Sequence, residues 1–443
     1  MTIGKLRVFG VVAVLTAFTL AACSGGGTAT TGPGGSAAPT DAAAACASGT
    51  TKIEVESWWT TGGEATGLQK LFDQFNKDNP TLCAFNAAIA GGAGTQAKAD
   101  IKTKTLAGTP PDTFQVHMGH ELLDTYVNIS AGSVLSPLDT SIIDPTKFPA
   151  GVVSIISGKD GKPYTVPVNI HRANELWFSK KVFTDNNLTA PKTWADFFTA
   201  ADALKAKNIT PLALGDNGIW AFGMVFETIL IADLGADGFQ GLWTGATKWD
   251  DPKVTQALND LKKVFGYVNS DHNALTWDQA NQLVIDGKAA MTIMGDWANG
   301  DYVAKKYTDY GWAPAPGNDG IYQALADSFP LPSKAANQDG VKKLLAFMAS
   351  QVGQDIFNPY KGSIPARTDA GQAVDGVLAY NDYQKSAMQD WTKDTVVPSM
   401  EHGAAAAPAW ASAVEAALTT FQTGGDVAAT QAALVQAAKD AGY

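Results

Sequence analysis

The chain has 443 residues, of which 43 are acidic and 32 are lysine or arginine, so its formal net charge is -11. A chain of this length has room for two domains. The acidic balance argues against binding to nucleic acid, which proteins contact through basic surface, and we expect no such partner. Beyond the N-terminal segment, no stretch is long and apolar enough to cross a membrane.

The N-terminal segment has the features of an export signal. Lys5 and Arg7 precede an apolar run at 8–20, which closes on the sequence LAAC at 20–23. The run is too short for a permanent membrane span, and its end resembles the bacterial lipoprotein site, where cleavage precedes a cysteine that then carries lipid. We expect residues 1–22 to be a lipoprotein signal peptide. Cys23 would then anchor the protein to the outer face of the cytoplasmic membrane.

The segment at 23–49 is expected to be a flexible tether. After Cys23 it consists mostly of small residues and has almost no large apolar side chain, so it cannot form a core. Once Cys23 is modified, Cys46 and Cys83 are the only cysteines left to pair with each other. Both stand just upstream of strands that should be neighbours in a parallel sheet. An oxidising compartment favours a disulfide between them over two free thiols.

The first element of the globular part brings two tryptophans to the end of a strand. Polar and apolar residues alternate at 52–56, which predicts a strand, and Trp58 and Trp59 follow where a polar loop begins. Four apolar residues at helical spacing within 64–77 predict a helix that ends before Pro80. Ligands bind at the carboxyl ends of strands in open α/β sheets, and indoles stack on sugar rings. The alternative is a tryptophan pair packed into the core.

The remaining chain alternates between strands and helices. Strands are expected near 83–89, 112–119, 163–170, 209–214, 287–294, 311–316 and 324–332, and helices near 95–106, 193–204, 220–234, 252–268, 276–285, 341–352, 414–421 and 426–438. Thr193 and Asp196 are spaced like a capping box. The glycine-rich loop at 90–94 lacks the residues of a phosphate-binding loop, which favours a tight turn beside a ligand cleft.

This alternation predicts an α/β architecture with mostly parallel sheets. The strands at 163–170 and 311–316 are candidate crossings between two lobes, and the strand at 324–332 is expected to be an edge strand. We expect the first lobe to comprise 50–168 plus 309–365 and the second to comprise 169–308 plus 366–443. A ligand cleft would lie between them.

Seven short stretches, in the same order along the chain, carry a resemblance to a known family. They are SWWTTGGE at 57–64, PPDTFQVH at 110–117, VPVNIHR at 166–172, MGDW at 294–297, DSF at 327–329, KGSI at 361–364 and HGA at 402–404. The chain resembles the extracellular solute-binding proteins of ABC sugar importers (family 1), most closely the glucose/mannose-binding branch. The resemblance implies a two-lobe, type II periplasmic-binding-protein fold that closes on its ligand by hinge motion.

The resemblance also implies roles for individual residues. Trp58 and Trp59 would form a stacking platform, with Trp277 and Trp297 facing the sugar from the other lobe. The remaining expected ligand contacts are polar: Glu64, Asp327, Lys361 and His402, completed by Gln115, His117 and Asn169. Charged groups suit this work because charge-assisted hydrogen bonds to hydroxyls are short and strong. For Trp277, the buried start of a helix is an equal alternative. Leu325 offers only backbone where a polar side chain would help to choose between epimers.

The function implied is the binding of a monosaccharide, glucose first and mannose or galactose next, for delivery to a membrane permease. We expect a monomer without enzyme activity, cofactor or metal ion. Another mono- or disaccharide is an alternative ligand. A secreted glycoside hydrolase is a rival class, and it would need two carboxylates roughly 5–10 Å apart across one bond, one with a raised pKa. A lipoprotein that presents sugar to a receptor is a third possibility.

Overall fold

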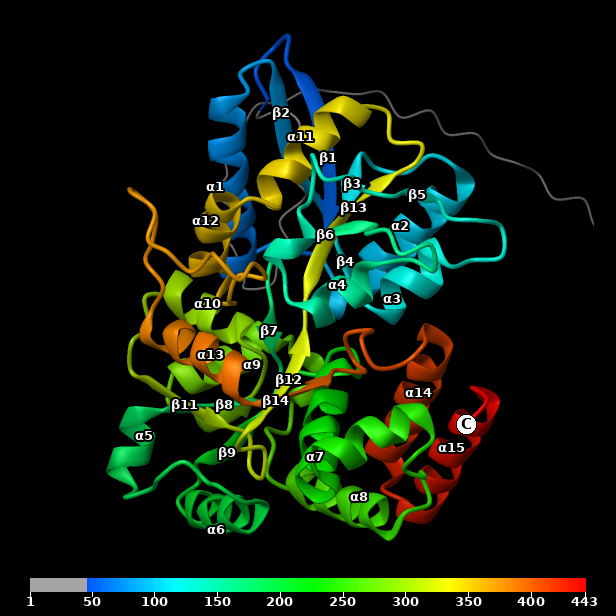
Figure 1. Ribbon diagram of the computed structural model, residues 1–443. Coiled ribbons are helices and arrows are strands. Elements are labelled where there is room, and N and C mark those ends of the chain that lie inside the picture. The colour runs from blue at the N-terminus through cyan, green and yellow to red at the C-terminus, as the bar shows by residue number, and fades with distance from the viewer. Residues whose placement is uncertain (1–45) are drawn as a thin grey trace, which may run out of the picture. The chain divides into compact units, whose positions relative to one another are not determined.

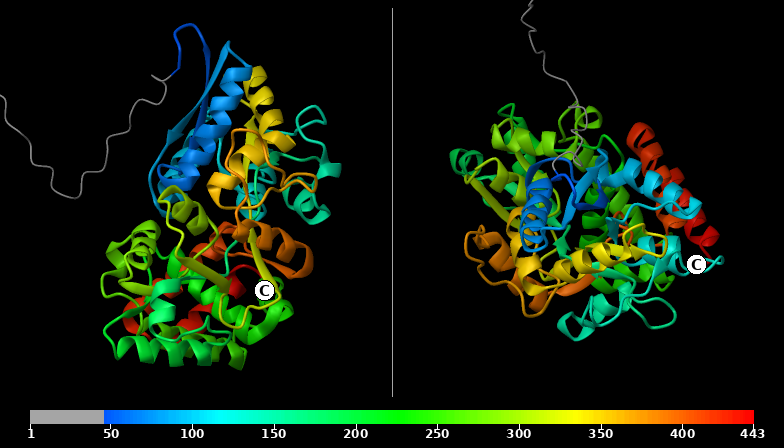
Figure 2. Two further views of the ribbon diagram at one scale, coloured as in Figure 1. Left: turned by 90° about the vertical axis from the view of Figure 1, so that its left-hand side faces the viewer. Right: turned by 90° about the horizontal axis from the view of Figure 1, so that it is seen from above.

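The computed structural model describes residues 46–443 (Figures 1 and 2). The expected signal peptide, Cys23 and nearly all of the tether lie outside these residues. Within them, no helix has both the length and the apolar character that crossing a membrane requires. Helices and strands alternate along the chain and build two lobes, each with sheets covered by helices, so the expected two-lobe α/β class is confirmed.

A parallel sheet of order β2-β1-β3 begins the first lobe. Its strands are β1 (Thr51–Ser57), β2 (Leu82–Ala88) and β3 (Thr113–Phe114). Ile53 and Val55 of β1 are fully buried, as their alternation with polar residues predicted. Helix α1, Gly62–Asp78, follows β1 and buries the expected apolar face of Leu68, Leu71, Phe72 and Phe75 against the sheet. Trp58 and Trp59 therefore lie in the short turn between β1 and α1.

The second sheet of the first lobe forms around β13 (Asp327–Pro332). Three short strands pair antiparallel with it: β4 (Val116–His117), β5 (Leu135–Ser136) and β6 (Thr165–Pro167). The other helices of this lobe are α2 (Thr95–Ala107), α3 (His120–Leu122), α4 (Ala150–Ile156), α11 (Gln338–Met348) and α12 (Gln351–Lys361). The pairing sets Asp327 opposite His117, which lie far apart in the sequence.

The second lobe contains two sheets, of order β11-β8-β10-β9 and β14-β12-β7. Their strands are β7 (His171–Arg172), β8 (Glu175–Ser179), β9 (Thr210–Ala213), β10 (Ala289–Ile293), β11 (Tyr310–Pro314), β12 (Ile321–Leu325) and β14 (Thr395–Pro398). Strand β8 runs antiparallel to both β10 and β11, β7 runs antiparallel to β12, and all partners of β13 pair antiparallel with it, so the expectation of mostly parallel sheets is wrong. The reason for β8 is that it follows directly from a crossing, and no helical connection fixes its direction.

Nine helices cover these sheets in the described part of the chain. They are α5 (Lys180–Asp185), α6 (Trp194–Lys205), α7 (Trp220–Thr244), α8 (Pro252–Phe265), α9 (Trp277–Ile285), α10 (Trp297–Ala304), α13 (Asp382–Lys393), α14 (Pro408–Gly424) and α15 (Val427–Asp440). Thr193 and Asp196 form the expected capping box at the start of α6. Helix α7 extends beyond its expected end, with a break in helical geometry at Gly235.

Two pairs of consecutive strands carry the chain between the lobes. Strand β6 pairs within the first lobe and is followed by β7, which pairs within the second. The reverse passage runs from β12 to β13. The expected crossing at 311–316 is wrong, because β11 pairs with β8 inside the second lobe, and 324–332 is no edge strand, because β13 pairs with three strands. Strand β11 pairs with β8, and β12 pairs with β14 and β7, so 310–325 belongs to the second lobe. The chain therefore returns to the first lobe at the start of β13 and not, as expected, at residue 309.

Cys46 and Cys83 form a disulfide, with their Cα atoms 5.8 Å apart. Cys83 lies inside the edge strand β2, one residue after its start, and not upstream of the strand. The bond therefore ties the segment that precedes β1 to the neighbouring strand. Both cysteines lie outside the set of residues that line the cavity described below.

Candidate functional site

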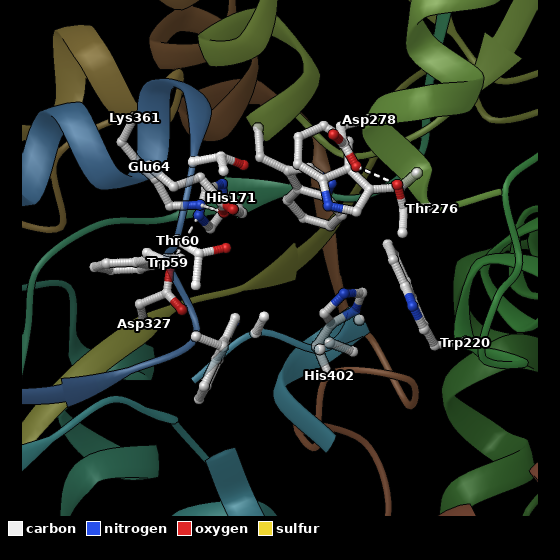
Figure 3. A pocket seen from close by; sticks show the side chains of 18 of the residues that line it. Trp59, Thr60, Glu64, His171, Trp220, Thr276, Asp278, Asp327, Lys361 and His402 are labelled. Carbon is white, nitrogen blue, oxygen red and sulfur yellow. Dashed lines mark hydrogen bonds and ion pairs between the residues drawn. The ribbon is translucent and has the colours of Figure 1, made fainter. Parts of the chain in front are cut away.

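A cavity of about 270 Å³ lies where the two lobes face each other. Residues from the turn after β1, from helix α1, from β4 and from β13 line it on one side, and residues from α7, α9, α10 and the loop after β14 line it on the other (Figure 3). The lining residues are Trp58, Trp59, Thr60, Thr61, Glu64, Ala90, Gly91, Gly92, Ala93, His117, His171, Trp220, Thr276, Trp277, Asp278, Trp297, Leu325, Asp327, Lys361 and His402. All of the expected contact residues except Gln115 and Asn169 are among them.

Trp58 and Trp59 both reach the cavity, but they are held differently. Trp59 is almost fully buried and packs against Phe329 and Phe357, with ring centroids 5.8 and 5.3 Å apart. Trp58 is only partly buried, and its ring lies against His117 at 5.1 Å. Trp59 therefore packs in the core and also lines the cavity. Trp58 is the more exposed of the two and offers more of its ring to a ligand.

Asp327 is the most heavily bonded carboxylate of the cavity. Its Oδ1 accepts from Gln115 Nε2 at 2.8 Å, and its Oδ2 accepts from Asn169 Nδ2 at 2.9 Å. Gln115 and Asn169 are fully buried and do not line the cavity, so their place is behind Asp327 and not at the ligand surface. Burial alone would raise the pKa of Asp327, but the hydrogen bond from His171 and the charge of Lys361 outweigh it and hold that pKa far below its ordinary value.

His171 is a cavity residue that was not among the expected contacts. Its Nε2 lies 3.0 Å from Asp327 Oδ2, and its Nδ1 bonds to Asp296 Oδ1. Burial alone would lower the pKa of His171, but the charge of Asp296 outweighs burial and raises that pKa above its ordinary value. Two features of the sequence could have indicated it: His171 stands in the VPVNIHR stretch, and it follows Asn169 by two residues, which places both side chains on the same side of an extended segment.

Glu64 and Lys361 form an ion pair at the first-lobe wall. Lys361 Nζ lies 2.5 Å from Glu64 Oε1, and it also lies 5.0 Å from the centroid of the Trp59 ring. Lys361 is almost fully buried, although its ammonium keeps further protons to donate. Burying a lysine costs free energy unless the charge is paired. The pair with Glu64 stabilises Lys361 at the cavity wall and leaves its remaining protons for a polar ligand.

His117 and His402 bring the two lobes into contact. Their ring centroids are 5.4 Å apart, with His117 on β4 and His402 in the loop after β14. His402 Nδ1 lies 3.0 Å from Ser399 Oγ, and that hydroxyl donates to Glu227. Since the hydroxyl proton is used, Nδ1–H must donate to Ser399, which leaves Nε2 as an acceptor. Burial lowers the pKa of His402 well below its ordinary value, so the ring stays neutral.

Three tryptophans form the second-lobe wall. Trp277 and Trp297 are the first residues of α9 and α10, and Trp220 is the first residue of α7. Trp297 lies 5.3 Å from the His171 ring and 5.2 Å from the His402 ring. Trp277 begins α9 and lines the cavity, but it is only partly buried, so the alternative of a buried helix start does not describe it. Trp220 was missed because it stood at the head of an apolar run typical of a core helix.

In the described part of the chain, no group of three or more histidine, cysteine, aspartate or glutamate side chains could hold a metal ion. The cavity instead presents indole faces together with carboxylate, imidazole and ammonium groups. Flat aromatic faces suit the C–H surfaces of a sugar ring, and the polar groups suit its hydroxyls. The fold and the cavity thus define a two-lobe binding protein for a small polyhydroxylated ligand.

Comparison with known proteins agrees with this class. Residues 59–355 match the model of the bacterial extracellular solute-binding proteins, and the chain belongs to this family. It is 36% identical to an uncharacterized ABC transporter extracellular-binding protein of Pyrococcus horikoshii, over 88% of this chain and 87% of that one. It is 30% identical to a probable sugar-binding periplasmic protein of Mesorhizobium japonicum, over 89% of this chain and 95% of that one.

Two more distant likenesses extend the comparison. The glucose-binding protein GlcS of Saccharolobus solfataricus is 24% identical, over 69% of this chain and 59% of that one. Among solved structures, the bacterial solute receptor AcbH, described as exclusive for β-D-galactopyranose, matches with a TM-score of 0.75 and 21% identity, over 88% of this chain and 99% of that one. At that identity the likeness supports the fold alone. The relatives named here are binding proteins and receptors, and none is named as an enzyme.

Proposed function

We propose that this protein captures a single neutral hexose, glucose, in the cavity between its lobes and delivers it to an ABC permease. The observation that carries the proposal is the cavity lining itself: indoles from both lobes together with Glu64, Asp327, Lys361 and His402. A volume of about 270 Å³ falls just below the roughly 300–1,000 Å³ of sites for drug-sized ligands, which favours a monosaccharide over a longer sugar.

The charges of the cavity favour a neutral ligand. Glu64 and Asp327 contribute two carboxylates, and both already have cationic or donating partners in Lys361 and His171. An anionic sugar would bring a further negative charge against these carboxylates. A hydroxyl, in contrast, can donate to a carboxylate and accept from the ammonium of Lys361. Glucose is the hexose we propose, and the name of the relative GlcS supports it.

The same groups do not suit hydrolysis of a glycosidic bond. A glycoside hydrolase needs one carboxyl group that stays protonated and can donate to the leaving oxygen. The pKa of Asp327 is lowered by His171 and Lys361, which is the opposite of what an acid catalyst requires. Glu64 is bonded to Lys361 at 2.5 Å. We therefore favour binding without turnover.

We further propose that Cys23 carries the lipid and that 23–49 is the tether, so that the monomer works at the outer face of the cytoplasmic membrane. The LAAC sequence at 20–23 supports this part of the proposal. Mass spectrometry of the protein purified from its membrane fraction tests it. A Cys23 peptide with acyl mass agrees with the proposal, and an unmodified Cys23 or a retained segment 1–22 contradicts it.

Calorimetric titration of residues 24–443 with glucose, mannose, galactose, xylose and maltose tests the ligand. We expect micromolar or tighter binding of glucose, weaker binding of its epimers, and no release of reducing ends from maltose. Tighter binding of xylose or maltose would refute the choice of a hexose monosaccharide. Cleavage of maltose would refute the class.

A further inference from the structure

His171 lies where both crossing strands pass between the lobes. It is the first residue of β7, directly after the passage from β6, and it pairs with Leu325, the last residue of β12 before the passage to β13. Its side chain is 1% exposed, yet it reaches the cavity (Figure 3). A group in this position touches the ligand site and the hinge strands at once.

Both ring nitrogens of His171 face a buried carboxylate. Nδ1 bonds to Asp296, whose second oxygen accepts from Arg172 N at 3.1 Å, and Nε2 lies 3.0 Å from Asp327 Oδ2. Asp296 and Asp327 are at most 2% exposed. A bare lone pair on Nδ1 would face the lone pairs of Asp296. A bare lone pair on Nε2 could accept from Asn169 Nδ2 at 2.9 Å, but it would also face Asp327 Oδ2, and the charges of the two carboxylates favour a proton on each nitrogen. The geometry therefore fits an imidazolium between two carboxylates.

The other charged groups around His171 do not cancel the effect of the two carboxylates on its ring. Lys361 approaches from the first lobe, and its charge is paired with Glu64. His402 approaches from the second lobe and is neutral, because burial lowers its pKa. The Arg172 guanidinium turns away from the cavity and pairs with Glu175 at 2.9 Å. The carboxylates of Asp296 and Asp327 are thus the anions that the His171 ring meets directly.

The hydrogen bonds of Asp327 leave one position open. A carboxylate oxygen has about two lone pairs for acceptance. At Oδ2 both are used, by Asn169 Nδ2 at 2.9 Å and by His171 Nε2 at 3.0 Å. At Oδ1, Gln115 donates at 2.8 Å, whereas His117 Nε2 is 3.7 Å away, which is too long for a hydrogen bond. One lone pair of Oδ1 therefore remains between Asp327 and His117.

We propose that His171 is a positioning residue: as an imidazolium between Asp296 and Asp327 it keeps Asp327 ionised and its Oδ2 occupied, so that Oδ1 alone reads a ligand hydroxyl. This inference rests on the proposed function, because the hydroxyl belongs to the bound sugar. An ionised Asp327 can only accept hydrogen bonds, so the sugar hydroxyl that binds its Oδ1 must be the donor. An analogue with fluorine or hydrogen at that carbon leaves the buried carboxylate without its partner and is rejected.

The first experiment needs no ligand. Nitrogen chemical shifts of ¹⁵N-histidine-labelled protein report whether each ring nitrogen carries a proton, and the spectra of His171→Gln and His272→Gln assign two of the five histidines. We expect both nitrogens of His171 to carry a proton at about pH 7, above the ordinary pKa of about 6.5. Asp296→Asn, which keeps the ring, should lower the pKa of His171. A neutral His171 ring at pH 7 would overturn the inference.

The second experiment compares glucose with its monodeoxy and monofluoro analogues at each of the sugar's hydroxyl-bearing carbons. We expect one position at which both changes cost the wild-type protein about tenfold or more in affinity, in line with a hydrogen bond to a charged group. That discrimination should shrink in Asp327→Asn and in His171→Gln. His272→Gln is the matched control, because His272 pairs with Asp216 away from the cavity. Unchanged discrimination in His171→Gln, with the fold intact by circular dichroism, would contradict the inference.

The two experiments also separate this inference from the proposed function. If the wild-type protein bound no sugar, the proposed function would be refuted and the reading of a hydroxyl by Oδ1 would fall with it. The nitrogen shifts would still decide whether His171 is the imidazolium. If glucose bound tightly but His171 were neutral, the proposed function would stand and the positioning role would be refuted.

Discussion

The backbone N–H of Glu121, in the first lobe, donates a hydrogen bond of 3.0 Å to the carbonyl oxygen of Gly403, in the second. Gly403 directly follows the cavity residue His402, and its φ of 68° lies in the left-handed region that favours glycine. A Cβ atom at this position would come within 2.6 Å of Glu121 Cβ. The absence of a side chain at Gly403 therefore permits the close approach of the lobes beside His402.

Replacing Gly403 by alanine should weaken sugar binding more than it weakens the fold. The left-handed backbone alone costs an alanine about 1–2 kcal/mol of stability. Gly161→Ala is the matched control, because Gly161 has a φ of 76° and a Cβ atom added there would meet no atom within 4 Å. Urea unfolding should show a loss in both variants, larger in Gly403→Ala because its Cβ must also move away from Glu121. Calorimetry should show a loss of affinity in Gly403→Ala alone, and equal affinities would contradict the role of this contact.

The two neighbouring tryptophans should respond differently to truncation. Trp59→Ala should cost about 3–5 kcal/mol of unfolding free energy, because Trp59 is 1% exposed and packs between phenylalanines. Trp58→Ala should cost less stability but should reduce affinity for the sugar by removing an indole face. Trp312→Ala, which removes a partly buried indole of β11, is the control. An affinity for Trp58→Ala equal to that of the Trp312→Ala control would exclude Trp58 as a stacking surface.

Glu401 should make the fold less stable as the pH rises. Both of its side-chain oxygens are buried without a hydrogen-bond partner among the described residues. Burial, and then the charge of Glu415, raise the pKa of Glu401 well above its ordinary value. The folded state then holds a proton that the unfolded state releases above about pH 4.5, so this carboxyl costs stability as the pH rises from there toward its folded pKa.

Replacement of Glu401 by a neutral residue tests the direction of this pH dependence of stability. The measured quantity is the unfolding free energy of Glu401→Gln minus that of the wild-type protein. This difference should be more favourable to the variant at about pH 8 than at about pH 4.5. Glu54→Gln is the control, because Glu54 lies on the partly exposed side of β1. Urea unfolding at both pH values provides the measurement. A difference between Glu401→Gln and wild type that did not grow with pH would mean that the carboxyl is already ionised in the fold.

Removing the disulfide between Cys46 and Cys83 should lower stability without changing sugar affinity. The bond joins residues that are 37 positions apart in the sequence. Without it the unfolded chain gains conformational entropy, which for a loop of this length lowers the unfolding free energy by about 4 kcal/mol. Neither cysteine lines the cavity. The double variant Cys46→Ser/Cys83→Ser, compared with wild type by urea unfolding and by calorimetry, tests both statements. A loss of affinity at a concentration of urea where the variant is still folded would contradict the separation of the disulfide from the site.

Local patterns were sufficient for much of the fold. The alternation at 52–56 predicted β1, and helical spacing predicted the buried face of α1. The direction of β8 and the lobe to which β11 and β12 belong were not predictable in this way. Both depend on which strands pair after the chain crosses between lobes, and pairing partners are far apart in the sequence.

Most residues of the candidate site were predictable from the sequence, but the hydrogen bonds between them were not. Gln115 and Asn169 were expected to contact the ligand, yet the structure aims both at Asp327, at sequence separations of 212 and 158. His171 stands in the VPVNIHR stretch and was passed over, because nothing local indicated that Asp296 and Asp327 would flank its ring. Residue types reveal that a polar site exists, whereas the pairing of donors with acceptors emerges only from tertiary structure.

The glucose affinity of Asp327→Asn, measured beside that of the wild-type protein by equilibrium dialysis, tests the central claim most directly. Asparagine has nearly the shape of aspartate, but it lacks the charge that His171 and Lys361 stabilise and that a sugar hydroxyl would meet. We predict micromolar or tighter binding by the wild type and a loss of about tenfold or more in the variant, with its fold retained. Equal affinities, or no binding by either protein, would contradict a glucose site built around Asp327.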